Sequence, residues 1–192
     1  TESELLGKAG LREEEDIFAS VWKSAKNRWL WLAVNLCTAF FASRVIGNFE
    51  GTIEKFVALA TLMPIVAGIA GNSANQTTTI ITRSLALGQI TQDNARRLML
   101  KELAIGGFNG LLWGGIAGLF AYFLYHNAAL GIVMTGAMLL NLLVGATVGM
   151  AIPLAMQKLG RDPAIGSSVM ITAVTDSGGF FIFLGLATIF QI

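Results

Sequence analysis

The sequence predicts an all-α integral membrane protein in which an amphipathic link helix is followed by five transmembrane helices. Of its 192 residues, 54% are hydrophobic and only 13% are charged, whereas soluble domains carry roughly 25% charged residues. Three stretches of twenty or more residues are almost free of charge, and that length is enough for a helix to cross a bilayer. We therefore expect most of the chain to contact lipid.

Residues 1–28 are expected to form a cytosolic amphipathic link helix that leads into a transmembrane pore domain at residues 29–192. From Leu11 onward, apolar residues recur at helical spacing. Acidic residues at 13–16 precede basic residues at 23–28, an order that suits the dipole of a helix. The first twenty residues are polar and acidic, so no cleavable signal peptide is visible.

The long apolar segments predict five membrane spans. These are expected at residues 29–47, 53–82, 102–125, 128–156 and 164–191. The second would be about 45 Å long at 1.5 Å per residue, which exceeds a bilayer core of about 30 Å, so it must tilt or break. Pro64 is the expected position of a kink, and residues 47–51 are expected to form a turn.

Basic residues are unevenly distributed between the predicted loops. If the N-terminus is cytoplasmic, Arg44 and Lys55 are the only ones of the 13 lysines and arginines on the outer side. Cytoplasmic loops of membrane proteins are enriched in Lys and Arg, so we expect a multi-pass protein of the cell membrane with its N-terminus inside and its C-terminus outside. The basic residues form no stripe interleaved with aromatic residues, and we therefore expect no nucleic-acid binding.

Glycines recur every four residues within two of the predicted spans. They are Gly106, Gly110, Gly114 and Gly118 in the third span, and Gly145 and Gly149 in the fourth. Small residues at this spacing allow the backbones of neighbouring membrane helices to approach closely. We interpret these glycines as packing positions rather than functional ones.

Asp176 is the one acidic residue that falls near the middle of a predicted span. A carboxylate at that depth costs about 2.5–3.5 kcal/mol on insertion scales and normally faces water, a counter-charge or an ion pathway. No Lys or Arg lies mid-span to pair with it. Thr172 shares its helical face, and Thr175 and Gly179 lie within one turn. We interpret Asp176 as marking a cation pathway, with a structural salt bridge as the alternative.

A second polar cluster lies on one stripe of the second span. We call this set the polar stripe; it consists of Gly68, Asn72, Gln76, Thr79 and Arg83. Amides in lipid are costly, so the polar stripe is expected to face protein or water, either bonding neighbouring helices or lining a pore. Both clusters offer oxygens and amides, without a mid-span histidine or thiolate, and oxygen ligands favour hard cations such as Mg²⁺ and Ca²⁺.

The sequence does not indicate an enzyme. Its single histidine, His126, lies in a predicted outer turn, far in depth from Asp176. Neither a catalytic triad that contains histidine nor an HExxH zinc motif can be assembled from these residues. The single cysteine, Cys37, lies in an apolar run, so neither a disulfide framework nor a thiolate metal site is expected.

Two segments of the chain resemble the transmembrane domain of MgtE-type magnesium channels. Leu62 to Gly88 (LMPIVAGIAGNSANQTTTIITRSLALG) follows the family's pattern of a proline, G-N-x-x-x-Q, and an arginine followed by LALG. Asp162 to Gly179 (DPAIGSSVMITAVTDSGG) is similar to its D-P-A start and membrane aspartate. The stretch GLREEED resembles the family's link helix, and the resemblance covers nearly the whole chain.

The resemblance implies a homodimer whose pore runs along the subunit interface, lined by the second and fifth spans. It implies that Asp176 of both chains binds hydrated Mg²⁺ as the transported ion, assisted by a backbone carbonyl near Thr172, with Asn72 close to the same path. Members of the family usually carry cytosolic Mg²⁺-sensing domains before the link helix. We therefore expect this chain to be a truncated or naturally short member that lacks those domains.

Three functions remain open from the sequence. The first is a passive channel for divalent cations that selects Mg²⁺. The second is a secondary carrier that exchanges or co-transports Mg²⁺ with H⁺ or Na⁺, and a broken helix at Pro64 would fit such a carrier. The third is a helical scaffold that anchors a soluble partner and transports nothing.

Overall fold

The computed structural model describes residue 18 and residues 20–163 and 167–192. Within these residues it contains α-helices and no strand. The helices are α2 (Val21–Gly47), α3 (Glu50–Lys55), α4 (Ala58–Ala86), α5 (Gln92–Tyr125), α6 (Ala128–Lys158) and α7 (Ser167–Ile189). The predicted all-α class is thus confirmed for the described part of the chain.

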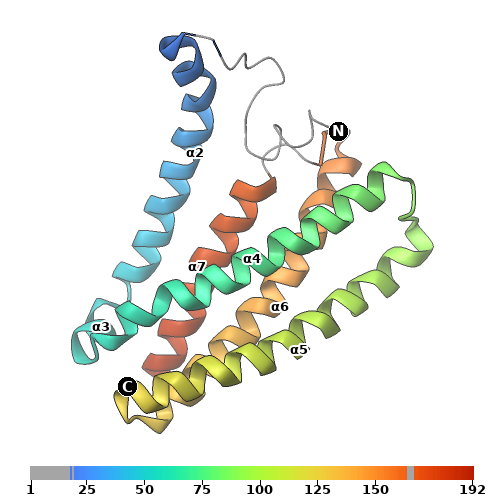
Figure 1. The fold of residues 1–192 in the computed structure, drawn as a ribbon. Coiled ribbons are helices and arrows are strands. Elements are labelled where there is room, and N and C mark those ends of the chain that lie inside the picture. The colour runs from blue at the N-terminus through green and yellow to red at the C-terminus, as the bar shows by residue number, and fades with distance from the viewer. Residues whose placement is uncertain (1–17, 19, 164–166) are drawn as a thin grey trace.

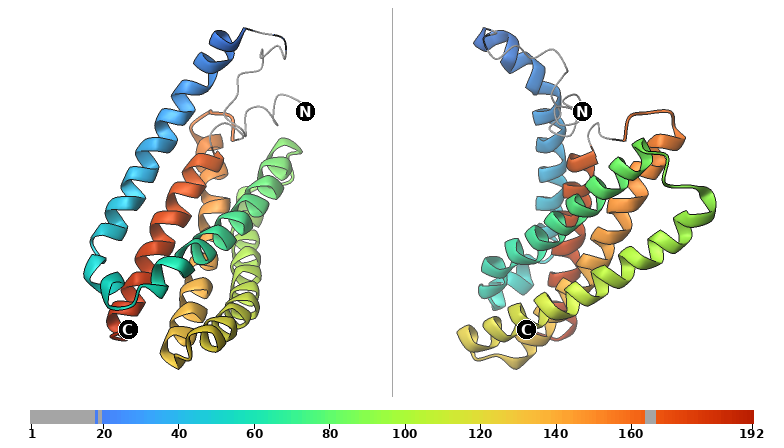
Figure 2. Two further views of the ribbon diagram at one scale, coloured as in Figure 1. Left: turned by 60° about the vertical axis from the view of Figure 1, so that its left-hand side comes forward. Right: turned by 45° about the vertical axis from the view of Figure 1, so that its right-hand side comes forward.

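The five long helices run alternately in opposite directions (Figures 1 and 2). α5 and α6 form an antiparallel hairpin, α2 packs along α7, and α4 crosses α6 and α7 obliquely. α6 lies at the centre, where it contacts α4, α5 and α7. Its fully buried side chains include Leu130, Met138 and Leu142, which form the main core together with Leu59 of α4 and Phe183 of α7.

Four helices in the described part of the chain are long and apolar enough to cross a membrane. They are α2, α5 from Asn94 onward, α6 and α7. α4 is not among them, although it has 29 residues, and its C-terminal half carries Asn72, Asn75 and Gln76. The chain is therefore a multi-pass membrane protein.

The second predicted span is broken near its start. The break lies at Phe56, whose φ of −141° and ψ of 84° are not helical, and it separates the short helix α3 from α4. Pro64 lies within α4, as its seventh residue. α3 occupies part of the expected turn at residues 47–51. Glu50 in its first turn and Lys55 in its last suit the helix dipole.

The boundary expected between residues 28 and 29 falls inside α2, which is unbroken from Val21 to Gly47. Ser20 caps this helix, because its side-chain oxygen accepts a hydrogen bond of 3.4 Å from the backbone N–H of Lys23. Most of the predicted link helix, with the acidic run at 13–16, lies outside the described residues. The same holds for residues 164–166, where the fifth span was expected to begin.

The glycine repeats lie where helices approach most closely, as predicted. A Cβ atom added to Gly110 of α5 would lie 2.7 Å from the Cα of Leu139 in α6, and one on Gly114 would lie 2.9 Å from the carbonyl oxygen of Thr135. On the other side of α6, a Cβ on Gly149 would lie 2.7 Å from the carbonyl oxygen of Ala74 in α4. The glycines therefore let α6 contact both neighbours at backbone distance.

This packing predicts different effects for two adjacent alanine substitutions. Gly114→Ala should destabilise the α5–α6 hairpin by about 1–3 kcal/mol, because the new methyl group overlaps backbone atoms of α6. Gly115→Ala has the same effect on helix propensity, but a Cβ there meets nothing within 4 Å. Thermal unfolding of both variants in one detergent measures the difference. Equal midpoints would contradict the proposed close approach.

Candidate functional site

The polar stripe of α4 lies on the surface of the single chain. Its central side chains, Asn72, Gln76 and Thr79, are all exposed. The opposite face of the helix is buried against α6 and α7, with Ala70 and Ala74 fully covered. Within the described residues, the amides of Asn72 and Gln76 therefore do not bond α4 to the other helices.

Asp176 lies on α7 and is half-buried. Among the described residues, its carboxylate forms no hydrogen bond and no ion pair. The structural salt bridge considered from the sequence is therefore not formed in the described part of the chain. Thr172, one turn earlier, is exposed, and its hydroxyl donates a hydrogen bond of 2.9 Å to the carbonyl oxygen of Ser168.

Two close contacts fix the register of α4 against α7. A Cβ on Gly71 of α4 would lie 3.3 Å from Oγ1 of Thr175 in α7, and a Cβ on Gly179 would lie 3.4 Å from the Cα of Ala67. Asn72 and Asp176 each follow a residue of the first contact. The amide of the polar stripe and the membrane carboxylate therefore lie at the same level of the bundle.

Thr175 and Gly179 face the interior of the chain rather than its surface. Thr175 is fully buried, and its hydroxyl donates to the carbonyl oxygen of Ile171 at 3.0 Å. Gly179 is also buried, and a Cβ there would overlap the side-chain amide of Asn141 in α6. Of the predicted pore-lining residues, these two set the packing of α7 within a single chain, whereas Asn72, Gln76 and Thr79 form its surface.

Asn141, which the sequence analysis missed, joins three helices beside Asp176. It is fully buried in α6, and its Nδ2 donates hydrogen bonds of 3.1 Å to the carbonyl oxygens of Val66 in α4 and Thr175 in α7. Its Oδ1 has no partner among the described residues. The amide therefore holds the backbone of α7 at the residue that precedes the carboxylate. A lone Asn in an apolar span could have signalled this role.

The burial of a second acidic side chain, Glu102, was not predicted from the sequence. It was placed at the start of a span, yet α5 begins ten residues earlier, and Glu102 is only 7% exposed. Its Oε2 accepts a hydrogen bond of 2.9 Å from the hydroxyl of Thr77 in α4. Next to it on α4, Thr78 donates to the carbonyl oxygen of Gly149 at 2.8 Å. These bonds connect α4 to α5 and α6 away from the polar stripe.

A single chain offers no closed metal site within its described residues. No group of three or more His, Cys, Asp or Glu side chains there could hold a metal ion. Tight sites for hard cations use several oxygen ligands, whereas Mg²⁺ often keeps most of its waters and contacts one or two carboxylates. The arrangement at Asp176 suits the second mode, in which one carboxylate contacts a hydrated ion.

Comparison with known proteins gives one consistent family. The model of the MgtE family, described as divalent cation transporter, matches residues 63–186. The magnesium transporter MgtE of Bacillus subtilis is 31% identical over 167 residues, which cover 87% of this chain and 37% of that protein. The Enterococcus faecalis protein of the same name is 31% identical over 193 residues, covering 98% of this chain and 42% of that protein.

The Thermus thermophilus magnesium transporter MgtE is also 31% identical, over 157 residues that cover 82% of this chain and 35% of that protein. The chain thus spans about two fifths of the length of the curated relatives it matches. The region matched by the family model runs from within α4 to within α7, and it includes the polar stripe and Asp176.

The Asn141 bonds predict a loss of stability that is specific to this amide. Asn141→Leu removes both hydrogen bonds between helices and should lower the free energy of unfolding by about 1–2 kcal/mol, given typical bonds between membrane helices. Asn109→Leu in α5 is the control, because no hydrogen bond of the Asn109 side chain is found among the described residues. Denaturation in mixed micelles compares the two. A larger effect at Asn109 would contradict the assignment.

Proposed function

The chain belongs to the MgtE family of divalent cation transporters, and we propose that it forms a Mg²⁺ pathway along the interface of a homodimer. The observation that carries this proposal is the exposed polar stripe of α4 at the level of Asp176. The relatives are named magnesium transporters, which supports Mg²⁺ as the transported ion.

The exposed amides are the reason for a second copy. Asn72 and Gln76 lie on the surface of a helix that packs within a membrane bundle. Facing hydrocarbon, their polar groups would have no hydrogen-bond partner, and each would cost several kcal/mol at most. If a second chain turns the same face toward the first, the two polar stripes line a water-filled space between the chains. Two-fold symmetry then places the two Asp176 carboxylates at one level on the axis.

The chemistry of this arrangement suits a hydrated divalent ion. Mg²⁺ gives up its water reluctantly, so the two Asp176 carboxylates supply a charge of −2 and accept hydrogen bonds from the water shell. The amide oxygens of Asn72 and Gln76 and the hydroxyl of Thr79 accept further bonds from it. The backbone carbonyl near Thr172 contributes one more oxygen at a neighbouring level. The ion passes because it is attracted without being stripped of its water.

Thr175 and Gly179 take a positioning role in this proposal rather than a lining role. Both are buried against α4 and α6 in the single chain. Their contacts with Gly71 and Asn141 hold the segment of α7 that carries Asp176. The geometry of the carboxylate pair therefore depends on packing inside each chain.

We further propose that α4 also crosses the membrane, which gives five spans in all, and that the N-terminus is cytoplasmic. The 29 residues of α4 extend about 44 Å at 1.5 Å per residue, enough to cross a bilayer core of about 30 Å at a tilt. Among the described residues, Arg44 and Lys55 are the basic residues at the end of the bundle where α2 finishes and α4 begins. The other Lys and Arg lie at the opposite end, which supports placing that end inside.

The test of the proposed function is Mg²⁺ uptake into vesicles that contain Asp176→Asn. The substitution keeps size and hydrogen bonding but removes both charges from the axis of the dimer. Uptake per protein should fall at least tenfold, because the remaining ligands are neutral dipoles. Asn72→Ala should have a smaller effect, since it removes a contact with the hydrated ion and no charge.

Asp162→Asn serves as the control for charge. Asp162 lies in the loop between α6 and α7, where solvent screens its charge, and uptake should change less than twofold. Wild-type uptake with unchanged Mg²⁺ preference in Asp176→Asn would show that the carboxylate is structural. Equal losses in both Asp variants would point to a general effect of negative charge.

A further inference from the structure

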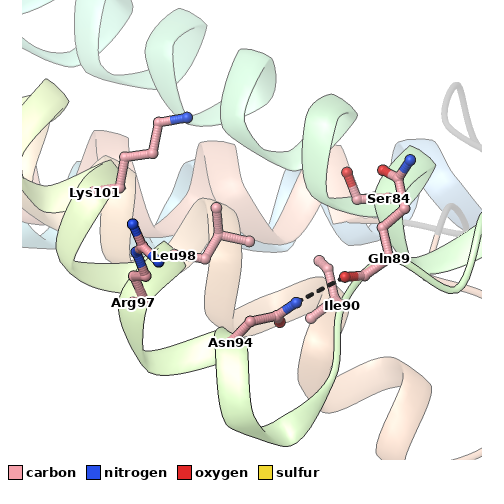
Figure 3. Close-up of a pocket in the computed structure, with 7 residues that line it drawn as sticks. All are labelled: Ser84, Gln89, Ile90, Asn94, Arg97, Leu98 and Lys101. Atoms are coloured by element: carbon pink, nitrogen blue, oxygen red, sulfur yellow. Dashed lines mark hydrogen bonds between the residues drawn. The ribbon is translucent and has the colours of Figure 1, made fainter.

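A cavity of about 560 Å³ lies where α4 ends and α5 begins. Asn94, Arg97 and Lys101 line it from α5, and Ser84 lines it from α4 (Figure 3). The three α5 residues are spaced by three and four positions, so they share one face of that helix. The cavity is separate from the polar stripe and from Asp176, and nothing in the proposed transport path uses it.

The wall of the cavity is fixed by the backbone of the loop. α4 ends in a Schellman motif: Gly88, with φ of 65°, donates its N–H to the carbonyl oxygen of Leu85, and Gln89 donates to that of Ser84 at 2.9 Å. Nδ2 of Asn94 then donates to the carbonyl oxygen of Gln89 at 2.8 Å, which is the dashed line in Figure 3. Three hydrogen bonds therefore hold the loop that forms this wall of the cavity.

The lining carries two positive charges that form no ion pair with the described side chains. Among the described residues, neither Arg97 nor Lys101 forms an ion pair, and the lining contains no acidic side chain. The nearest described carboxylate in the sequence, Glu102, is buried and bonded to Thr77. The described lining is therefore positively charged, and it would attract an anion.

The level of the cavity indicates which anion is available. α5 has 34 residues, about 51 Å at 1.5 Å per residue, so its first ten residues extend beyond a bilayer core of about 30 Å. Arg97 and Lys101 therefore lie where lipid headgroups are. Leu87 and Leu100 nearby are each 59% exposed, and Ile90 and Leu98 add apolar surface to the cavity wall. A ligand with a charged group and an apolar chain could contact both the basic side chains and this apolar surface.

We propose that this cavity binds a phosphate group, supplied by the headgroup of an anionic membrane lipid. The guanidinium of Arg97 matches two phosphate oxygens at once, Lys101 adds a point charge, and the hydroxyl of Ser84 donates a further hydrogen bond. Basic pockets between helices at the cytoplasmic side of membrane proteins bind lipid headgroups in this way. The bound lipid would hold the end of α4 against α5. This site is independent of the proposed Mg²⁺ pathway.

The test is the thermal unfolding midpoint of the purified chain in a neutral detergent, titrated with short-chain phosphatidylglycerol. Ligand that binds the native state raises the midpoint with concentration. Phosphatidylglycerol should raise it by several degrees, and phosphatidylcholine with the same acyl chains should not. Inorganic phosphate is the third probe. A matching rise with phosphate alone would support the phosphate site with a soluble anion as its source.

Two double variants separate this cavity from general electrostatics. Arg97→Gln with Lys101→Gln should raise the phosphatidylglycerol concentration at half-saturation by about tenfold or more. Each basic residue near an anionic surface contributes roughly 1 kcal/mol to binding. Arg96→Gln with Lys158→Gln removes the same charge from exposed positions outside the cavity. The phosphatidylglycerol concentration at half-saturation should then stay within twofold of that of the unchanged chain. Equal stabilisation by the two lipids, or equal loss in the two double variants, would overturn the proposal.

Discussion

A polar side chain in contact with lipid hydrocarbon has no hydrogen-bond partner, which costs free energy. This free-energy cost governs how the long helices are arranged. Several polar side chains find hydrogen-bond partners inside the chain: Thr78 donates to α6, Thr77 to Glu102, and Asn141 to both α4 and α7. The amides of the polar stripe do not, because they lie on the outer face of α4. The proposed ion pathway runs along this face of α4.

α6 is the element that allows α4 to present that face. Its glycines let α4 and α5 approach at backbone distance, and its apolar residues form much of the core. Asn141 then connects the same helix to the carbonyl oxygen beside Asp176. The backbone next to the half-buried carboxylate is therefore held by a hydrogen bond from the neighbouring helix. In the proposed homodimer, this bond would help to fix the position of the carboxylate in each chain.

Features that depend on local sequence were predicted well, and features that depend on the rotation of helices were not. The turn at His126, with its left-handed φ of 50°, and the glycine contacts follow from residues within a few positions. The burial of Thr175 and Gly179 follows from how α7 is turned against α4 and α6, which periodicity in a nearly all-apolar helix does not reveal. The break at Phe56 was not predicted either, because no proline or glycine marks that position.

The most direct test of the account is whether the polar stripe faces water. In a Cys37→Ser background, Gln76→Cys and Phe123→Cys, an exposed position on α5, are treated in vesicles with a charged, membrane-impermeant methanethiosulfonate reagent. The account predicts fast labelling of the cysteine at position 76, slowed by Mg²⁺, and little labelling at position 123. If both cysteines stayed unreactive, α4 would face lipid or a dry interface, and a hydrated pathway along it would be contradicted.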